Sequence, residues 1–354
     1  MSPAAILTGA KRHELLPPVL TLLALMAINA CFNASFLHLH WQGGHVYGSL
    51  VDIVKASAPL ALVSMGMTLV IATRGIDISV GAVVAIAASV AAWMIGGSLS
   101  VVDGVPVHLS RFPMWAAIGG ALAIATACGL WNGLLVSFVG MQPIIATLVL
   151  MVAGRGVAQL VTGGQIITIY YAPYFEIGNG YLLGIPIAVY ICAVVLAILL
   201  WLTRRTALGL FIEAVGINPA AANVAGLPAR KILFWVYGFT GLCAGVAGLI
   251  VSSNVKSADG NNAGMLLELD AILAVTLGGT SLNGGRFNLA GSVVGALVIQ
   301  TLTYAIYSLG VPPEVNLVVK ATVVFAVMLL QSAEFRRQLV AWARGSRTFQ
   351  GQPS

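Results

Sequence analysis

The segment Glu213-Ala-Val-Gly-Ile-Asn-Pro-Ala-Ala-Ala-Asn-Val-Ala-Gly226 interrupts an otherwise strongly apolar chain. One long hydrophobic run precedes it and another follows it. Glu213, Ile217 and Ala221 recur at helical spacing, and the alanines favour a helix. Gly226, followed closely by Pro228, is a typical helix end. The pattern predicts a short polar helix held outside the hydrophobic runs.

The composition of the whole chain explains why this polar segment is unusual. Of the 354 residues, 59% are hydrophobic and only 8% are charged, whereas soluble domains carry roughly 25% charged residues. Such a chain cannot cover a surface that faces water, so the lipid bilayer must be its solvent. A membrane-spanning helix needs roughly 20 apolar residues.

We therefore predict an all-α polytopic membrane protein with about ten transmembrane helices. The eighth apolar run is short, and we expect it to be a half-helix or a re-entrant segment. The ten expected spans are 15–34, 52–73, 79–98, 114–139, 143–162, 183–203, 230–252, 267–281, 289–309 and 314–332.

Basic residues gather before the first span, around the central segment and after the last span. An excess of Lys and Arg marks cytoplasmic loops, and with ten spans all three clusters fall on one side. We therefore predict cytoplasmic tails at 1–14 and 333–354, a transmembrane domain at 15–332 and a cytoplasmic segment at 204–231. The clusters are Lys11, Arg12, Arg204, Arg205, Arg230, Lys231, Arg336, Arg337, Arg344 and Arg347.

Two segments resemble each other near the starts of the third and ninth spans. Both 75–84 and 285–296 run from Gly through Asp or Asn into a helix of small residues. A repeat unit of five spans would invert the second copy, as in many transporters. We expect an inverted five-helix repeat on this basis.

Polar residues in or near the spans are candidates for lining a translocation pathway or for joining helices by hydrogen bonds. An Arg at the centre of a span costs roughly 2.5–3.5 kcal/mol on insertion scales, so Arg155 must face protein, water or lipid headgroups. Asp77 and Asp270 are candidate partners by charge, although the sequence alone cannot pair them, and snorkelling to the surface is the alternative. The candidates are Asp77, Asn132, Gln142, Thr147, Arg155, Gln159 and Asp270.

The two acids also have local interpretations. Asp77 follows Gly75 in a break between spans, where transporters often place their sites. An ordinary cytoplasmic turn, with Arg74 as the salt-bridge partner of Asp77, is the alternative. Asp270 and Glu268 open the eighth span, where acids also favour the helix macrodipole.

The sequence carries no motif for nucleotide binding or catalysis. The tract Gly279-Thr-Ser-Leu-Asn-Gly-Gly-Arg286 approaches the phosphate-loop spacing but lacks the required Lys-Ser/Thr. No nucleophile triad or metal-ligand spacing is present either, so we expect neither an enzyme nor a bound cofactor. The polar central segment is too rich in Ala and Asn for a basic membrane anchor, which favours a docking helix for a soluble partner.

The central segment resembles the cytoplasmic coupling segment of permeases of ribose-type sugar ABC importers. The resemblance extends over most of the chain, from about residue 52 to 332. It includes Gly75-Ile-Asp-Ile-Ser-Val-Gly81, Glu268-Leu-Asp-Ala-Ile272, Leu277-Gly-Gly-Thr-Ser-Leu282 and Gly291-x-x-x-Gly295-Ala.

Within this family the chain is most similar to the galactofuranose-importing permeases. Two departures are Arg74, where the family usually has Gly, and Gly285-Arg-Phe-Asn288, which replaces the commoner Gly-Lys-Gly type of loop. The closer similarity lies in 151–160, 261–264, 285–289 and 312–314.

The resemblance implies a permease subunit that imports a monosaccharide, galactofuranose or a similar sugar, across the bacterial inner membrane. It implies three partners: a cytoplasmic ABC ATPase, often with tandem domains, that binds ATP and Mg; a second permease subunit, identical or paralogous; and a periplasmic sugar-binding protein. Glu213 would meet basic ATPase residues, and Gly216 and Gly226 would permit turns. The implied ATPase-coupling residues are Glu213, Gly216, Asn218, Ala221, Ala222 and Gly226.

Other functions remain open at this point. An ABC permease for another sugar or small polar solute would have the same features. A secondary transporter driven by an ion gradient would use membrane acids such as Asp77 and Asp270, but it would not need the docking segment. A membrane scaffold without transport activity would not need polar breaks in its spans.

Overall fold

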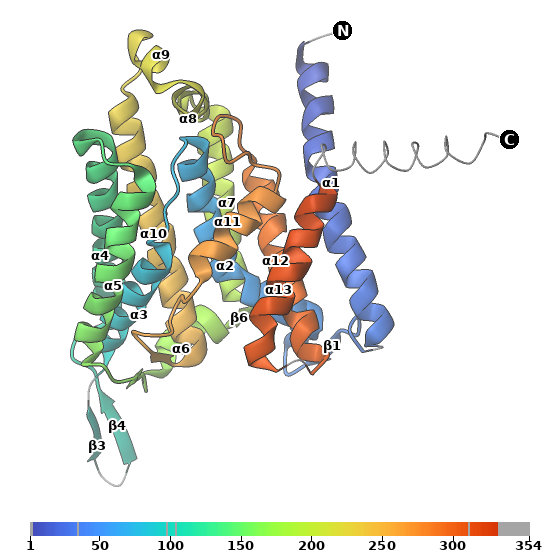
Figure 1. Cartoon of the computed structure of the whole chain (residues 1–354). Coiled ribbons are helices and arrows are strands. Elements are labelled where there is room, and N and C mark those ends of the chain that lie inside the picture. The colour runs from blue at the N-terminus through green and yellow to red at the C-terminus, as the bar shows by residue number, and fades with distance from the viewer. Residues whose placement is uncertain (1–2, 34, 97, 103–104, 311, 332–354) are drawn as a thin grey trace, which may run out of the picture.

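Long helices run side by side through the molecule and two short helices project from one end (Figure 1). The computed structural model describes residues 3–331 except 34, 97, 103–104 and 311. The helices are α1 Pro3–Phe32, α2 Ser49–Ala72, α3 Val80–Ile95, α4 Met114–Leu134 with a π-helical continuation Leu135–Val139, α5 Pro143–Thr162, α6 Ala172–Asn179, α7 Ile187–Arg205, α8 Leu208–Ile217, α9 Pro219–Val224, α10 Ala229–Val255, α11 Leu267–Leu277, α12 Leu289–Ser308 and α13 Pro313–Gln331.

The structure also contains short strands, although the sequence predicts an all-α protein. They form two-stranded antiparallel sheets in the connections at the end opposite α8 and α9 (Figure 1). Hairpins and close chain crossings pair backbone groups that would otherwise be unsatisfied. The strands are β1 His40–Gln42 with β2 His45–Tyr47, β3 Ser98–Val102 with β4 Val105–Leu109, β5 Ile167–Thr168 with β8 Ser257–Ala258, and β6 Tyr181–Leu182 with β7 Ile185–Pro186.

Among the described residues, 7 helices are long and apolar enough to cross a membrane: α1, α2, α4 with its continuation, α5, α7, α10 and α12. In α1 the apolar stretch is Leu15–Phe32, although the helix begins at Pro3. Each of the other three expected spans contains a helix that does not meet this criterion, namely α3, α11 and α13. The chain is thus a multi-pass membrane protein, while the total of ten spans stays a prediction.

Helices α2 and α10 form the centre of the bundle. In their apolar windows 83% of α2 and 67% of α10 is buried, against 28% for α4 and 22% for α5. Glycines allow α10 to approach its neighbours closely: a side chain at Gly241 would overlap α4, and one at Gly248 would meet α3. Small residues serve the same purpose in membrane helix packing generally, so the glycines of α10 form a packing surface.

Two helices, α3 and α11, are too short to cross a bilayer alone. They have 16 and 11 residues, respectively, and a helix of 16 residues is only ~24 Å long. A non-helical segment, 73–79, leads from the end of α2 to the start of α3. The starts of α3 and α11 meet where Gly81 faces Gly264 and Glu268, because a side chain at Gly81 would overlap both. The prediction that the eighth apolar run is a short helix is confirmed.

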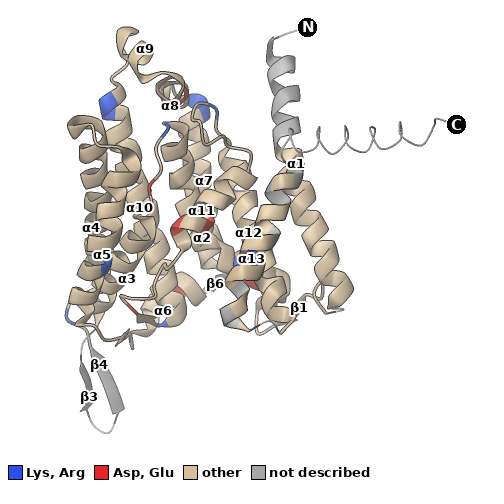
Figure 2. Ribbon diagram, viewed as in Figure 1, with Lys and Arg blue, Asp and Glu red and all other residues tan. Residues whose placement is uncertain are grey.

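Basic residues mark the end of the molecule that carries α8 and α9 (Figure 2). Arg204 and Arg205 lie in the last turn of α7, and Arg230 and Lys231 begin α10. These four residues of the central cluster therefore lie at the end of the molecule that carries α8 and α9, and the cytoplasmic location of that end stays a prediction. The predicted C-terminal cluster and tail lie outside the described residues.

Candidate functional site

The central segment folds as two helices, α8 and α9, which corrects the prediction of a single helix. The break falls at Asn218, whose backbone is extended with φ −159° and ψ 101°. Its side chain accepts hydrogen bonds from the amides of Ala220 and Ala221 at 3.0 and 3.1 Å. Pro219 occupies the first helical position, so Asn218 and Pro219 together start a new helix instead of continuing α8.

The predicted coupling residues divide into exposed and supporting ones. Asn218, Ala221 and Gly226 are exposed, whereas Gly216 and Ala222 are buried and Glu213 is half-buried. The turn expected at Gly226 is present, with φ +84°, but Gly216 lies within α8 and forms no turn.

Helices α8 and α9 expose large apolar side chains, which were not among the predicted coupling residues. Ile217 and Val224 are 61% and 92% exposed, and Leu210 on α8 is 69% exposed. These side chains lie at the end of the molecule that carries Arg204, Arg205, Arg230 and Lys231. We call Leu210, Ile217 and Val224 the docking face. Ile217 and Val224 could have been noticed as bulky apolar residues within the polar segment 213–226, whereas Leu210 precedes that segment.

Beneath the docking face, α8 rests directly on the main chain of the bundle. The amide of Gly285 donates to the carbonyl of Ala72, the last residue of α2, at 2.8 Å. A side chain at Gly216 would overlap that carbonyl oxygen and lie 2.6 Å from the Gly285 nitrogen. Gly216 is therefore required for close approach between α8, the end of α2 and the loop that contains Gly285.

Three predicted pathway residues come together around the non-helical segment 73–79. Asp77 is 1% exposed, and its Oδ1 accepts hydrogen bonds from the amide and hydroxyl of Ser79 at 2.9 and 2.6 Å. The Asn132 amide donates to the Ser79 hydroxyl at 2.8 Å. The hydroxyl of Thr147 donates to the carbonyl of Ile76 at 3.3 Å. We call Asp77, Ser79, Asn132 and Thr147 the inner cluster.

Two buried polar atoms, one in the inner cluster and one beside it, lack hydrogen-bond partners in the part of the chain that the structure describes. Oδ1 of Asn132 and the hydroxyl of Tyr237 are buried and have no hydrogen-bond partner among the described residues. The Tyr237 hydroxyl lies against Gly75, where a side chain would come within 2.5 Å of it. Buried polar atoms without partners are costly and often mark functional sites. Tyr237 and Ser79 were not among the predicted site residues, because a single Tyr or Ser in a span is an ordinary packing residue.

Arg155 and Gln159 on α5 form a second group, on the side of the strands. Nη1 of Arg155 donates to the carbonyls of Ala263 and Asn261 at 2.5 and 3.3 Å. Nε2 of Gln159 donates to Oδ1 of Asn261 at 2.5 Å. We call Arg155, Gln159, Asn261 and Ala263 the outer cluster. The expected pairing of Arg155 with Asp77 or Asp270 is wrong.

An acid, Asp259, lies next to the outer cluster and has a lowered pKa. Asn262 donates to the carboxylate of Asp259 at 2.6 Å, and this hydrogen bond lowers the pKa of Asp259. Asp259 also accepts from the amide of Asn261 at 2.8 Å, which shapes the loop that Arg155 holds. A cation, an amide and an acid therefore line one exposed flank of an apolar helix.

The remaining predicted residues lie elsewhere. Asp270 on α11 forms an ion pair with Lys320 on α13, with 2.5 Å between Oδ2 and Nζ. Lys320 was not singled out, although a lone Lys in an apolar run needs a partner. Gln142 is exposed at the start of α5. Arg74 donates to the carbonyls of Ile217 and Asn283, so the expected salt bridge between Arg74 and Asp77 is wrong.

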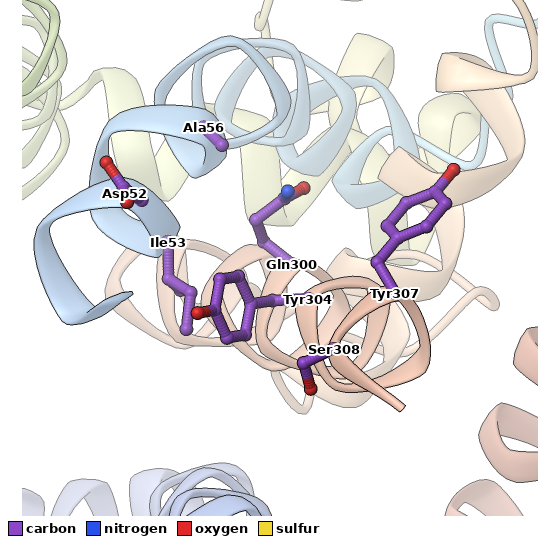
Figure 3. Close-up of a pocket in the computed structure, with 7 residues that line it drawn as sticks. All are labelled: Asp52, Ile53, Ala56, Gln300, Tyr304, Tyr307 and Ser308. Carbon is purple, nitrogen blue, oxygen red and sulfur yellow. The ribbon is translucent and has the colours of Figure 1, made fainter. Parts of the chain in front are cut away.

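A cavity of about 370 Å³ opens between the first turns of α2 and the end of α12. Figure 3 shows Gln300 and Tyr304 of α12 directed toward α2, with Tyr307 beside them. The Tyr304 hydroxyl donates to Ser49 at 2.6 Å. The lining residues are Asp52, Ile53, Ala56, Gln300, Tyr304, Tyr307 and Ser308, and none of them belongs to the inner or outer cluster.

Known proteins resemble this chain over most of its length. The galactofuranose transporter permease protein YtfT of Escherichia coli (strain K12) is 49% identical over 321 residues, which are 90% of each chain. The fructose import permease protein FruF of Bifidobacterium longum (strain NCC 2705) is 40% identical over 89% of this chain and 86% of the relative. The ribose import permease protein RbsC of Bacillus subtilis (strain 168) is 37% identical over 89% and 92%.

No solved structure matches the chain. A family described as "Branched-chain amino acid transport system / permease component" matches residues 49–328. This range contains α2 to α12 with both clusters and the docking face. The extent of that match and the identity to the galactofuranose, fructose and ribose permeases show that the chain belongs to this permease family and confirm its predicted resemblance to the permeases of sugar ABC importers.

Proposed function

We propose that the chain is the permease subunit of an ATP-driven importer that carries a monosaccharide, galactofuranose or a similar sugar, across the bacterial inner membrane. The observation that carries this proposal is the 49% identity, over 90% of both chains, to a permease named for galactofuranose. Relatives named for fructose and ribose import support a sugar as the substrate class. Another sugar or small polar solute is the second candidate, because 40% identity is also found to a fructose permease.

The docking face supports the proposal that another protein supplies the energy for transport. Leu210, Ile217 and Val224 expose apolar surface on two short helices that project from the bundle (Figure 1). An amphipathic helix that presents apolar anchors to a groove is a common mode of protein recognition. We propose that an ABC ATPase, which binds the ATP and Mg, receives this face in the cytoplasm. This chain then needs no cofactor of its own and is not an enzyme.

The outer cluster supports a polar route along α5. Gln159, Asn261 and Asn262 are exposed, although they border an apolar span. Polar groups that faced lipid would have no partners there, so this flank faces water or protein. We propose that Arg155 and Gln159 line the sugar pathway, which a second permease subunit completes, and that a periplasmic binding protein delivers sugar at the end with the strands.

The two short helices, α3 and α11, support the proposal of an inverted repeat. In a ten-span chain α3 is the third membrane helix and α11 the eighth, which is the offset that a five-helix repeat requires. Both are short, and their starts meet through Gly81 and Gly264. We propose α3 and α11 as the related pair, instead of the segments 75–84 and 285–296, which begin the third and ninth spans. Ten spans also place both termini in the cytoplasm.

The proposal is tested with the permease assembled with its ATPase and binding protein in proteoliposomes. Uptake of labelled galactofuranose, ribose and fructose is measured with and without ATP, and with an ionophore that dissipates ion gradients. We expect uptake that needs ATP and the binding protein, with galactofuranose preferred and no effect of the ionophore. Uptake that proceeds without the ATPase under an ion gradient would instead establish a secondary transporter.

A further inference from the structure

The end of α2 is a junction of three segments that are far apart in the sequence. The last residue of α2, Ala72, accepts from Gly285 at 2.8 Å, and Gly216 of α8 lies against the same carbonyl. The chain then turns at Thr73 and Arg74 and enters the segment that carries Asp77. The docking helices, the loop before α12 and the approach to the inner cluster therefore share one contact region.

One side chain bridges all three segments. Nη2 of Arg74 donates to the carbonyl of Ile217 at 2.7 Å, and Nε donates to the carbonyl of Asn283 at 3.1 Å. Ile217 is the last residue of α8, whose final carbonyls lack partners within the helix and favour a cation. The guanidinium suits this position, because its rigid fork of N–H donors can serve two acceptors at once.

The backbone of Arg74 adopts an unfavourable conformation for a residue with a side chain. Its φ is 63°, in the left-handed region that glycine adopts without cost. Strained residues persist where the surrounding structure holds them and often belong to functional sites. The side chain also packs closely on Gly284, where φ is 80° and a side chain would overlap the Arg74 stem. A side chain that only filled space at this position would need neither the strained backbone nor the two hydrogen bonds.

We propose that Arg74 is a positioning residue that transmits movement of α8 and α9 to the segment carrying Asp77. This inference rests on the proposed function of the docking face. When the ATPase displaces α8, the Ile217 carbonyl moves with it, and Arg74 carries that displacement into segment 73–79 and the loop at Asn283. Asp77 follows Arg74 by three residues and is fixed to Ser79 within the inner cluster.

The test uses the complete transporter in proteoliposomes and measures the number of sugar molecules imported per ATP hydrolysed. Arg74→Gly removes both hydrogen bonds and relieves the backbone strain, so it separates coupling from folding. We expect the import-to-hydrolysis ratio to fall at least ~5-fold, the lower end of typical coupling factors. The melting temperature should stay equal or rise. Arg74→Lys should also lower the ratio, because one ammonium cannot reproduce the rigid fork.

The matched control is Lys256→Gly. Lys256 is also a cation with positive φ, 58°, but it ends α10 at the opposite end of the molecule, with its ammonium 5.0 Å from the Phe175 ring. Its replacement removes the same charge and the same kind of strain, and should leave the import-to-hydrolysis ratio unchanged. An unchanged ratio in Arg74→Gly overturns the inference, as does an equal fall in Lys256→Gly.

A further variant separates this inference from the proposed function. Val224→Asp places a charge in the docking face and should abolish copurification of the ATPase. If the ATPase still binds and is still stimulated by sugar, the docking proposal fails and the inference about Arg74 fails with it. If Val224→Asp releases the ATPase while Arg74→Gly couples normally, only the inference about Arg74 is overturned.

Discussion

The guanidinium of Arg74 donates a 2.7 Å hydrogen bond to the main-chain carbonyl of Ile217, across 143 residues of sequence. The Ile217 side chain is 61% exposed on the docking face. Arg74, for its part, begins the segment that leads to the buried carboxyl of Asp77. The surface that we propose as the docking site of an ATPase is thus joined by one side chain to the segment that leads to Asp77, which gives predictions at both ends of this connection.

We expect replacement of Gly216 by any residue with a side chain, even alanine, to disturb the packing of α8 on α2. A methyl group there would overlap the Ala72 carbonyl and force α8 away from the hydrogen bond between Gly285 and Ala72. We expect Gly216→Ala to lower stability by roughly 1–3 kcal/mol, as overpacking does, and to abolish sugar-stimulated ATP hydrolysis. Gly119→Ala on α4 is the control, because its surroundings are open within 4 Å. Normal stimulation in Gly216→Ala would show that α8 need not rest on α2.

Asp77→Asn should impair transport more than folding. The amide oxygen of Asn can accept both hydrogen bonds from Ser79, so the turn is retained while the ionisable carboxyl is lost. Charged groups inside a membrane domain are costly and usually functional. We expect a several-fold lower rate of sugar uptake with an unchanged melting temperature. Ser79→Ala provides the comparison, since it keeps the carboxyl of Asp77 but removes the hydroxyl that joins Asp77 to Asn132, and it should lower the melting temperature. An unaltered uptake rate would make Asp77 a structural turn residue only.

The ion pair between Asp270 and Lys320 should stabilise the packing of α11 on α13. The two side chains are only 23% and 14% exposed, respectively, and breaking a buried pair by removing one partner costs about 3–5 kcal/mol. We expect Asp270→Asn and Lys320→Met each to be destabilising. The double variant should be less unstable than the sum of the two, as thermal unfolding of all four proteins can measure. Additive losses would mean that the two groups do not interact.

Arg155→Lys should weaken the outer cluster although the charge is kept. A lysine cannot hold the carbonyls of both Asn261 and Ala263 as the guanidinium does. We expect a higher KM for sugar uptake and an unchanged amount of folded protein in the membrane. Val157→Ala serves as the control, because Val157 is a half-exposed neighbour on α5 with 44% exposure. Equal KM values in both variants would remove Arg155 from the pathway.

The sequence by itself determined the membrane class, the positions of the long helices and the shortness of the eighth helix. These features follow from local composition, because the thickness of the bilayer fixes how many apolar residues a span needs. The docking segment was also visible in the sequence, since it is a polar stretch between two apolar runs. Its break into α8 and α9 was not foreseen, although Asn218 and Pro219 form a recognisable helix start.

Only the tertiary structure decided which polar residues meet. The sequence left Arg155 to pair with Asp77 or Asp270, yet Arg155 holds the loop at Asn261 and Ala263, and Asp270 pairs with Lys320. Such partners lie 50 to 108 residues apart. Charge alone cannot select among them, because helix packing sets which side chains come within hydrogen-bond distance. For the same reason Arg74, which looked like a local partner of Asp77, connects the docking helices to the core.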